Sequence, residues 1–180
     1  NTGNFSDANF GGHSRQVSIP HPYLQKSYIQ TLWNVRSKFP RFQITIEATH
    51  HGPTALGKPA LFIEIGTTEK EWNDVNLCNS VAEIIVKVMK KKQKPYPIAI
   101  CFGGTHYSDK FTSELIHGEH SLGTVVPKYA FEQINKNLFY HILERNVGAT
   151  VALLDWKGMG KNKQKLLGML EETDLEVIKL

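Results

Sequence analysis

The chain has 180 residues, which fits one domain and is long enough to bury a sizeable core. Hydrophobic residues make up 41% and charged residues 21%, which is ordinary for a globular protein and excludes a disordered or fibrous chain. The formal net charge of +4 permits nucleic-acid binding but does not require it.

The cysteine content and the length of the apolar runs limit the compartments in which the protein is expected. The two cysteines, Cys78 and Cys101, are expected to be buried and are too few for a disulfide scaffold or zinc ribbon, which indicates a reducing compartment such as the cytoplasm. The apolar runs are far shorter than the roughly 20 residues of a membrane helix. The chain begins at Asn1 without Met, so we expect residues 1–180 to form one domain, the C-terminal part of a longer chain.

In the first part of the chain, residues 1–20 are expected to be extended, with a turn or close backbone approach at Gly11-Gly12. Apolar side chains at spacings of four and three predict a helix from Pro22 that ends before Pro40. Alternation predicts a strand over residues 42–48 with one buried face. The almost wholly apolar residues 60–65 predict a strand covered on both faces, interrupted by Glu64.

Further along, Thr68 and Glu71 have the spacing of a capping box, which predicts a helix running to Met89 and ending in a lysine cluster. Residues 97–102 predict a buried strand, whereas residues 109–127 show no clear pattern. The remaining expected elements are a mainly helical stretch, a strand, a helix and a short strand, over residues 128–145, 150–154, 161–171 and 175–178.

The alternation of strands and helices predicts an α/β fold, with a three-layer α/β/α arrangement around a mixed, largely parallel sheet. In such sheets the functional site lies beyond the carboxyl ends of the strands. Polar and glycine-rich residues follow the predicted strands at four places: residues 50–54, 66–68, 103–107 and 155–156.

His50 and His51 follow a predicted strand. Neighbouring residues in a strand point to opposite faces, so both imidazoles can reach one site only if the chain turns, and Gly52-Pro53 can supply that turn. One functional interpretation is a catalytic or metal-binding imidazole supported by its neighbour. The alternative is a structural pair bonded to the backbone at a strand end.

Glu64 and residues 103–107 are the other candidates. A carboxylate in an apolar strand is costly unless it is paired, so Glu64 predicts a histidine or metal partner, or else an ion pair with Lys or Arg. Glu47 is expected on the polar face, solvated or paired. Residues 103–107 offer a possible anion-binding nest followed by His106 and Tyr107, or simply a tight turn.

Two more clusters have ambiguous interpretations. His117, Glu119 and His120 resemble a ligand set, but their spacing matches no justified metal motif. Lysines gather over residues 87–94 and 157–165, where they could contact RNA phosphates or simply form solvated helix ends.

Several segments together resemble one known family, in order and over nearly the whole chain: residues 2–5, 10–12, 49–54, 62–72, 102–107, 127–130 and 155–158. The segments His50-His51-Gly52-Pro53-Thr54 and Ile63 to Trp72 are the most specific. The family is that of the D-aminoacyl-tRNA deacylases of archaea and plants. Thr105 departs from it, because archaeal members usually have glycine there, and His120 stands where they tend to have an aromatic residue.

The resemblance implies hydrolysis of the ester between a D-amino acid and the 3′ end of tRNA, including clearance of aldehyde-modified D-aminoacyl-tRNA. It also implies a fold related to peptidyl-tRNA hydrolases and nucleoside phosphorylases, tRNA as the partner, and zinc as the cofactor. We expect a monomer with no membrane association. The alternatives are a related peptidyl-tRNA or nucleoside-directed hydrolase, and a tRNA-binding module without catalysis.

Ester hydrolysis needs a positioned water, a base or metal, and oxyanion donors. His50 or His51 is expected to activate water with support from Glu64, while His106 acts as acid or oxyanion donor. The same four residues are the candidate zinc ligands. The expected substrate-binding residues, with backbone N–H groups at the two glycines as oxyanion donors, are Thr54, Thr67, Trp72, Gly103, Gly104, Thr105, Tyr107 and Lys128.

Overall fold

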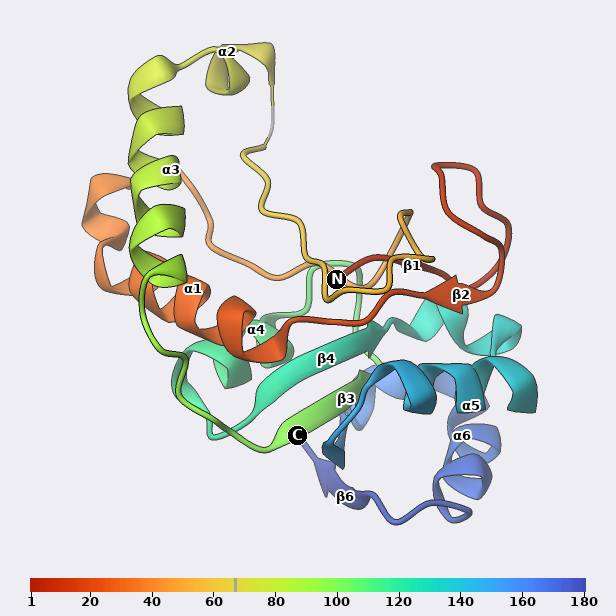
Figure 1. Ribbon diagram of the computed structural model, residues 1–180. Helices are drawn as coiled ribbons and strands as arrows, with labels where there is room; N and C mark the ends of the chain where they lie inside the picture. The colour runs from red at the N-terminus through yellow and green to blue at the C-terminus, as the bar shows by residue number, and fades with distance from the viewer. Residues whose placement is uncertain (67) are drawn as a thin grey trace.

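A computed structural model describes residues 1–66 and 68–180, and a four-stranded parallel sheet forms its centre (Figure 1). The strands have the spatial order β4-β3-β5-β6, with every neighbouring pair parallel. Their bounds are Ile98–Phe102 for β3, Ser121–Val126 for β4, Ala149–Leu154 for β5 and Glu176–Lys179 for β6. Three of these strands were predicted, whereas β4 comes from the segment that showed no clear pattern.

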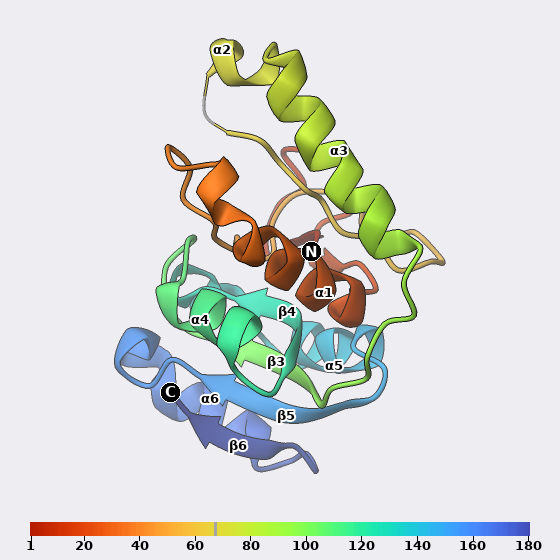
Figure 2. The ribbon, with the colours of Figure 1, turned by 90° about the vertical axis from the view of Figure 1, so that its left-hand side faces the viewer.

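Helices cover both faces of this sheet, which confirms the three-layer arrangement (Figure 2). One face packs against α1 (Pro22–Asn34) and α4 (Asp109–His117). The other packs against α5 (Lys136–Arg145) and α6 (Lys163–Leu170). All five residues of β3 are buried, as expected for a strand covered on both sides.

The side chains of β3 alternate between the two cores. Ile100 and Phe102 pack with the core that includes α5 and α6, whereas Ala99 and Cys101 pack with the core that includes α1 and α4. Three helices begin at a side-chain cap, in which Asp74, Ser108 and Asn135 accept the N–H of the residue three positions later. Each such cap contributes about 1 kcal/mol.

The predicted helix from residue 69 to 89 is divided in two. The capping box at Thr68 and Glu71 forms, but α2 (Glu69–Trp72) stops after one turn and Asp74 caps a new helix, α3 (Val75–Met89). Helix α3 packs on α1 through a small apolar cluster that includes Phe39, Ile84 and Val88, and it lies away from the sheet (Figure 2). Cys78, on this helix, is half-buried rather than buried.

Two predicted strands are extended segments outside the sheet. Residues 42–48 keep the expected alternation, with Ile46 and Ala48 buried, but form a single isolated bridge from Glu47 to Tyr107. Residues 61–66 alternate between half-buried and exposed, so the prediction that this strand is covered on both faces is wrong. The Glu64 side chain is 52% exposed. The segment is rich in apolar residues, but one of its two sides faces solvent.

The N-terminal residues pack against the loop that bears His50 and His51. Strands β1 (Gly3–Asn4) and β2 (Gln16–Val17) pair antiparallel, and Gly3 N–H donates to the backbone carbonyl of His51 over 2.7 Å. At Gly52 an added Cβ would lie 2.4 Å from the carbonyl carbon of Gly11, so the close approach expected at Gly11-Gly12 is present. The remaining elements are 3-10 turns: η1 (Arg36–Lys38), η2 (Lys128–Gln133) and η3 (Lys157–Asn162). Over the described residues, every helix is too short or too polar to cross a membrane.

Candidate active site

The candidate site lies at the carboxyl edge of the sheet, where an extended segment crosses beside the loop that follows β3. Ala48 N–H donates to the His106 carbonyl over 2.7 Å, and Thr49 N–H donates to the Val125 carbonyl over 2.9 Å. The Thr49 hydroxyl in turn accepts from Val125 N–H over 3.0 Å. These bonds fix the segment that bears His50 against β4 and against the loop that bears His106.

Both adjacent histidines reach the same site because the chain turns between them. His51 adopts a left-handed conformation with φ of 42°, which is uncommon outside glycine. As a result the rings of His50 and His51 have centroids 4.2 Å apart, and those of His50 and His106 lie 4.7 Å apart. Three imidazoles expected to act together are therefore neighbours.

The backbone sets which nitrogen of each adjacent histidine holds the proton. His50 Nδ1 lies 2.8 Å from the Ala48 carbonyl and His51 Nδ1 lies 2.6 Å from the Gly52 carbonyl. A carbonyl oxygen can only accept, so each Nδ1 donates and each neutral ring has an unprotonated Nε2. The alternative interpretation, a pair bonded to the backbone, is thus correct for Nδ1 and leaves Nε2 available.

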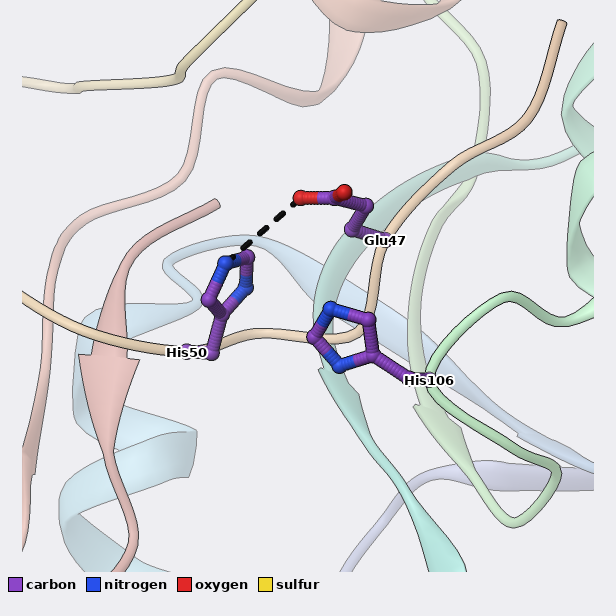
Figure 3. Close-up of side chains that lie close together, drawn as sticks. All are labelled: Glu47, His50 and His106. Carbon is purple, nitrogen blue, oxygen red and sulfur yellow. Dashed lines mark ion pairs between the residues drawn. The ribbon is translucent and has the colours of Figure 1, made fainter. Parts of the chain in front are cut away.

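Each of these Nε2 atoms faces a carboxylate. His50 Nε2 lies 3.5 Å from Glu47 Oε2 (Figure 3), and His51 Nε2 lies 3.8 Å from Glu64 Oε1. A lone pair facing a carboxylate is unfavourable unless a proton or metal ion lies between them. Two such pairs on neighbouring rings therefore form a site with affinity for cations.

Among the described residues, two groups of side chains have ligand atoms within 4.8 Å of one another: Glu47, His50 and His106, and His50, His51 and Glu64. Imidazole and carboxylate ligands suit zinc, and an Nδ1–H bonded to a backbone carbonyl is the usual support for a zinc-binding histidine. The donor set therefore fits the metal that the family resemblance implies. Glu47 was expected to be solvated or paired, and its position in this cluster was missed.

Tyr129 is a second residue that the sequence did not single out. Its hydroxyl lies 3.0 Å from His106 Nδ1 and so orients that ring. Burial, and next the charge of His50, lower the pKa of His106 from its usual value of 6.5. A hydrogen bond to Glu47 raises the pKa of the neighbouring Tyr107.

A cleft of about 940 Å³ opens beside the cluster. Glu47, His50, His51, Glu64 and Tyr107 line it at the reactive end. Its apolar walls come from α1, from the two extended segments and from α3, and include Tyr28, Leu32, Phe42, Ile44, Phe62, Ile65, Leu77 and Val81. A volume of this size and a largely apolar wall suit a small organic ligand.

The expected oxyanion donors are engaged elsewhere. Gly103 N–H donates to the Val126 carbonyl over 2.9 Å, and Gly104 N–H donates to the Gly158 carbonyl over 3.1 Å. Both glycines have positive φ, and the conformation orders the loop before His106. The prediction that these two N–H groups form an oxyanion hole is therefore wrong for the described conformation.

Some of the expected substrate-binding residues line the cleft, and others make contacts elsewhere. Tyr107 lines the cleft, whereas Thr54 is buried and accepts His13 N–H over 2.8 Å. The Thr105 hydroxyl donates within its own turn to the Tyr107 carbonyl. Lys128 is exposed, and its backbone N–H donates to the Gly104 carbonyl. Trp72 is 57% exposed on α2, where Thr68 and Glu71 line the cleft instead. Thr67 lies outside the described residues.

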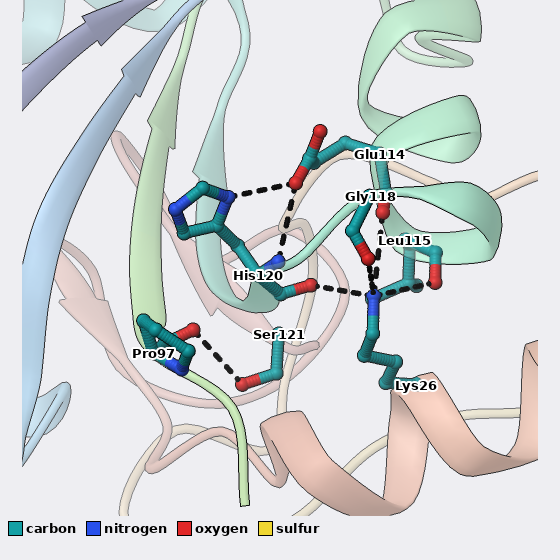
Figure 4. Close-up of polar contacts among 7 residues, drawn as sticks. All are labelled: Lys26, Pro97, Glu114, Leu115, Gly118, His120 and Ser121. Carbon is teal, nitrogen blue, oxygen red and sulfur yellow. Dashed lines mark hydrogen bonds and ion pairs between the residues drawn. The ribbon is translucent and has the colours of Figure 1, made fainter.

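The suspected ligand set in residues 117–120 is not assembled. His120 Nδ1 pairs with Glu114 Oε1 over 2.7 Å, whereas His117 packs edge-on to Trp33. Beside this pair the fully buried Lys26 ammonium donates to four backbone carbonyls at the end of α4 (Figure 4). The acceptors and distances are Glu114 at 3.3 Å, Leu115 at 3.0 Å, Gly118 at 2.9 Å and His120 at 2.8 Å.

A parallel sheet between two helical layers, with clustered histidines and carboxylates beyond its carboxyl edge, defines an α/β protein whose candidate site lies where this class of fold places its sites. The chain belongs to the D-aminoacyl-tRNA deacylase family, whose sequence model matches residues 1–178. A D-aminoacyl-tRNA deacylase of Cenarchaeum symbiosum is 52% identical and one of Methanosarcina mazei is 35% identical, over 98% and 99% of this chain. These matches span 69% and 60% of the two relatives.

A solved structure has the same fold. It is a crystal structure of a conserved protein of unknown function, with a TM-score of 0.92 and 30% sequence identity. The match covers 99% of this chain and 63% of the other. This chain therefore spans about two thirds of the length of the proteins that it matches.

Proposed function

We propose that this chain holds the reaction centre of a D-aminoacyl-tRNA deacylase, which hydrolyses the ester to release a free D-amino acid and tRNA. Family membership supports the reaction class. The observation that carries the proposal is the pair of unprotonated Nε2 atoms that face carboxylates at the end of a cleft. We expect the protein to act as a monomer in the cytoplasm, including on aldehyde-modified substrates.

His50 and His51 are suited to accept a proton from the attacking water. Each neutral ring presents Nε2 as an acceptor, because Nδ1 is held by a backbone carbonyl. Glu47 and Glu64 would then stabilise the imidazolium that forms. The carboxylate role first assigned to Glu64 is thereby shared with Glu47.

His106 is suited to polarise the ester carbonyl or protonate the leaving 3′ oxygen. When the Tyr129 hydroxyl donates to Nδ1, a neutral His106 has its proton on Nε2, the form an oxyanion donor needs. The lowered pKa of His106 favours this neutral form at pH 7.

We further propose that the cluster holds zinc, with His50 central and either Glu47 and His106 or His51 and Glu64 completing the ligand set. A ring that binds zinc through Nε2 would not accept a proton there, so in the first set His51 would be the proton acceptor. Zinc bound there would supply Lewis-acid chemistry and lower the pKa of water near neutrality. Elemental analysis and zinc titration of wild-type protein and a Glu47→Gln variant test this. If the variant keeps the zinc content and zinc affinity of the wild type, Glu47 is not a zinc ligand.

The function is tested by comparing wild type with His51→Ala and His106→Ala on D-aminoacyl-tRNA, with circular dichroism to show that the variants fold. A fall in kcat of at least roughly 100-fold is expected for each. Full rates in both folded variants would reject the assignment. An N-acylated aminoacyl-tRNA, run in parallel, distinguishes the related peptidyl-tRNA hydrolase, and tRNA binding without any turnover would indicate a non-catalytic module.

A further inference from the structure

A second cavity of about 490 Å³ lies between the end of α1 and helix α4, and none of the candidate catalytic residues lines it. Its polar and aromatic lining includes Trp33, Arg36, Gln43, Asp109, Ser113 and His117. The volume lies within the range of sites for small organic ligands. This cavity is therefore distinct from the histidine–carboxylate cluster.

Planar groups are arranged around Trp33 in this cavity. The Arg36 guanidinium lies over the indole with Cζ 4.5 Å from the ring centroid, and Arg36 Nη1 donates to the Trp33 carbonyl over 2.9 Å. His117 meets the same indole edge-on at 5.5 Å. Aromatic rings and arginine planes are the surfaces on which unpaired bases stack in RNA-binding proteins.

Hydrogen-bonding groups surround these planes. Gln43 provides an amide, Asp109 a carboxylate and Ser113 a hydroxyl, and all three residues line the cavity. An amide and a carboxylate can both pair with base edges, whereas a purely apolar guest would leave them without partners. The lining therefore fits a nucleobase better than a lipid chain or an apolar peptide.

The cavity and the reaction cleft share one wall. Phe39, Phe42, Gln43 and Ile44 line both, so a single extended segment forms the wall between them. Exposed cations stand on each side of this wall, since Arg36 lines the cavity and Arg41 lines the cleft. A ligand that crosses the wall would pass both guanidinium groups, which suit phosphate.

We propose that the cavity around Trp33 binds an unpaired nucleotide of the tRNA acceptor end that precedes the esterified terminal adenosine, with Arg36 and Arg41 contacting the phosphates between them. This inference rests on the proposed function, because the ester must lie at the histidine cluster for the preceding strand to reach the cavity.

The test compares two D-tyrosyl esters: D-Tyr-tRNA, and D-tyrosyl-adenosine, which lacks the preceding nucleotides. Wild type, Arg36→Ala and Arg41→Ala are assayed as full-length protein. Lys136→Ala is the matched control, because it removes one exposed cation on α5, across the sheet. We expect KM for D-Tyr-tRNA to rise roughly 10-fold in Arg36→Ala, with kcat unchanged and hydrolysis of D-tyrosyl-adenosine unaffected.

The salt dependence provides an independent readout. The slope of log(kcat/KM) for D-Tyr-tRNA against log[salt] should become shallower by about 0.7 in each arginine variant and stay the same in Lys136→Ala. Unchanged KM in Arg36→Ala, or an equal loss on both esters, would overturn the nucleotide subsite while the deacylase activity stands. If wild type hydrolyses neither ester, the proposed function and this inference both fail.

Discussion

Replacing Lys26 with Met should destabilise the protein strongly. The wild-type ammonium is fully buried and donates to four backbone carbonyls, three of them in the last turn of α4 or just beyond it. Burial lowers the pKa of Lys26, whereas the negative charge of Glu114 opposes that shift. Methionine retains most of the aliphatic volume but provides no donor.

The magnitude follows from the acceptors left behind. The Glu114 carbonyl keeps the Gly118 N–H as a donor, so the carbonyls of Leu115, Gly118 and His120 are the ones that lose the donor from Lys26. Each buried carbonyl without a donor costs about 1–3 kcal/mol, and the cost of burying an ammonium, which disappears in the variant, offsets part of the sum. Some of the carbonyls can recover a water, so we expect a net loss of about 3–5 kcal/mol. For a chain of this size that lowers Tm by roughly 10 °C.

Urea unfolding followed by tryptophan fluorescence and circular dichroism measures this change. Lys87→Met is the matched control, because Lys87 is exposed on α3 and its replacement should alter stability by less than about 0.5 kcal/mol. A loss below about 1 kcal/mol in Lys26→Met would refute the assignment of Lys26 as the residue that joins α1 to the end of α4.

Three further predictions concern the site. Tyr129→Phe should lower kcat about 10-fold by freeing the His106 ring, and an unchanged kcat would show that the 3.0 Å bond is dispensable. Gly52→Ala should cost about 2 kcal/mol in urea unfolding through its clash with Gly11, and wild-type stability would contradict that contact. In metal-free protein, NMR titration should place the His106 pKa below 6.5. The free energy of unfolding linked to neutral His106 is therefore fully present above pH 6.5 and is lost as the pH falls through the lowered pKa. A measured His106 pKa at or above 6.5 would refute this prediction.

Strands β3, β5 and β6 were predictable because local patterns decide them. The residues of β3 and the last four residues of β5 are apolar in a continuous run, as expected where helices cover both faces. The capping box at Thr68 was also predicted, since cap chemistry depends on residues three positions apart. The early end of α2 was not, because Asp74 offers a competing cap within the same helical pattern.

The site was predicted only in part because distant backbone bonds assemble it. His50, His51 and His106 were singled out from their positions at strand ends, and the structure places them together. Glu47 was missed because its alternation shows only that it is on the polar face. That face lies against residues 106 and 107 through the Ala48–His106 bond, which no local pattern predicts.

In segment 60–66 the sequence predicted a contact correctly but predicted the burial wrongly. Its apolar composition suggested a fully buried strand with a costly internal carboxylate. The segment instead forms a wall of the cleft with Glu64 half exposed beside His51. The predicted histidine partner was therefore present although the predicted burial was wrong, since partner and burial depend on different tertiary contacts.

The most direct test of the central claim is the rate of deacylation of D-Tyr-tRNA against L-Tyr-tRNA by full-length protein, with and without a chelator. We predict rapid release of D-tyrosine, little release of L-tyrosine, and loss of the activity on chelation that added zinc restores. Selective release that is indifferent to the chelator would keep the function and reject zinc. Release of neither amino acid would contradict the account.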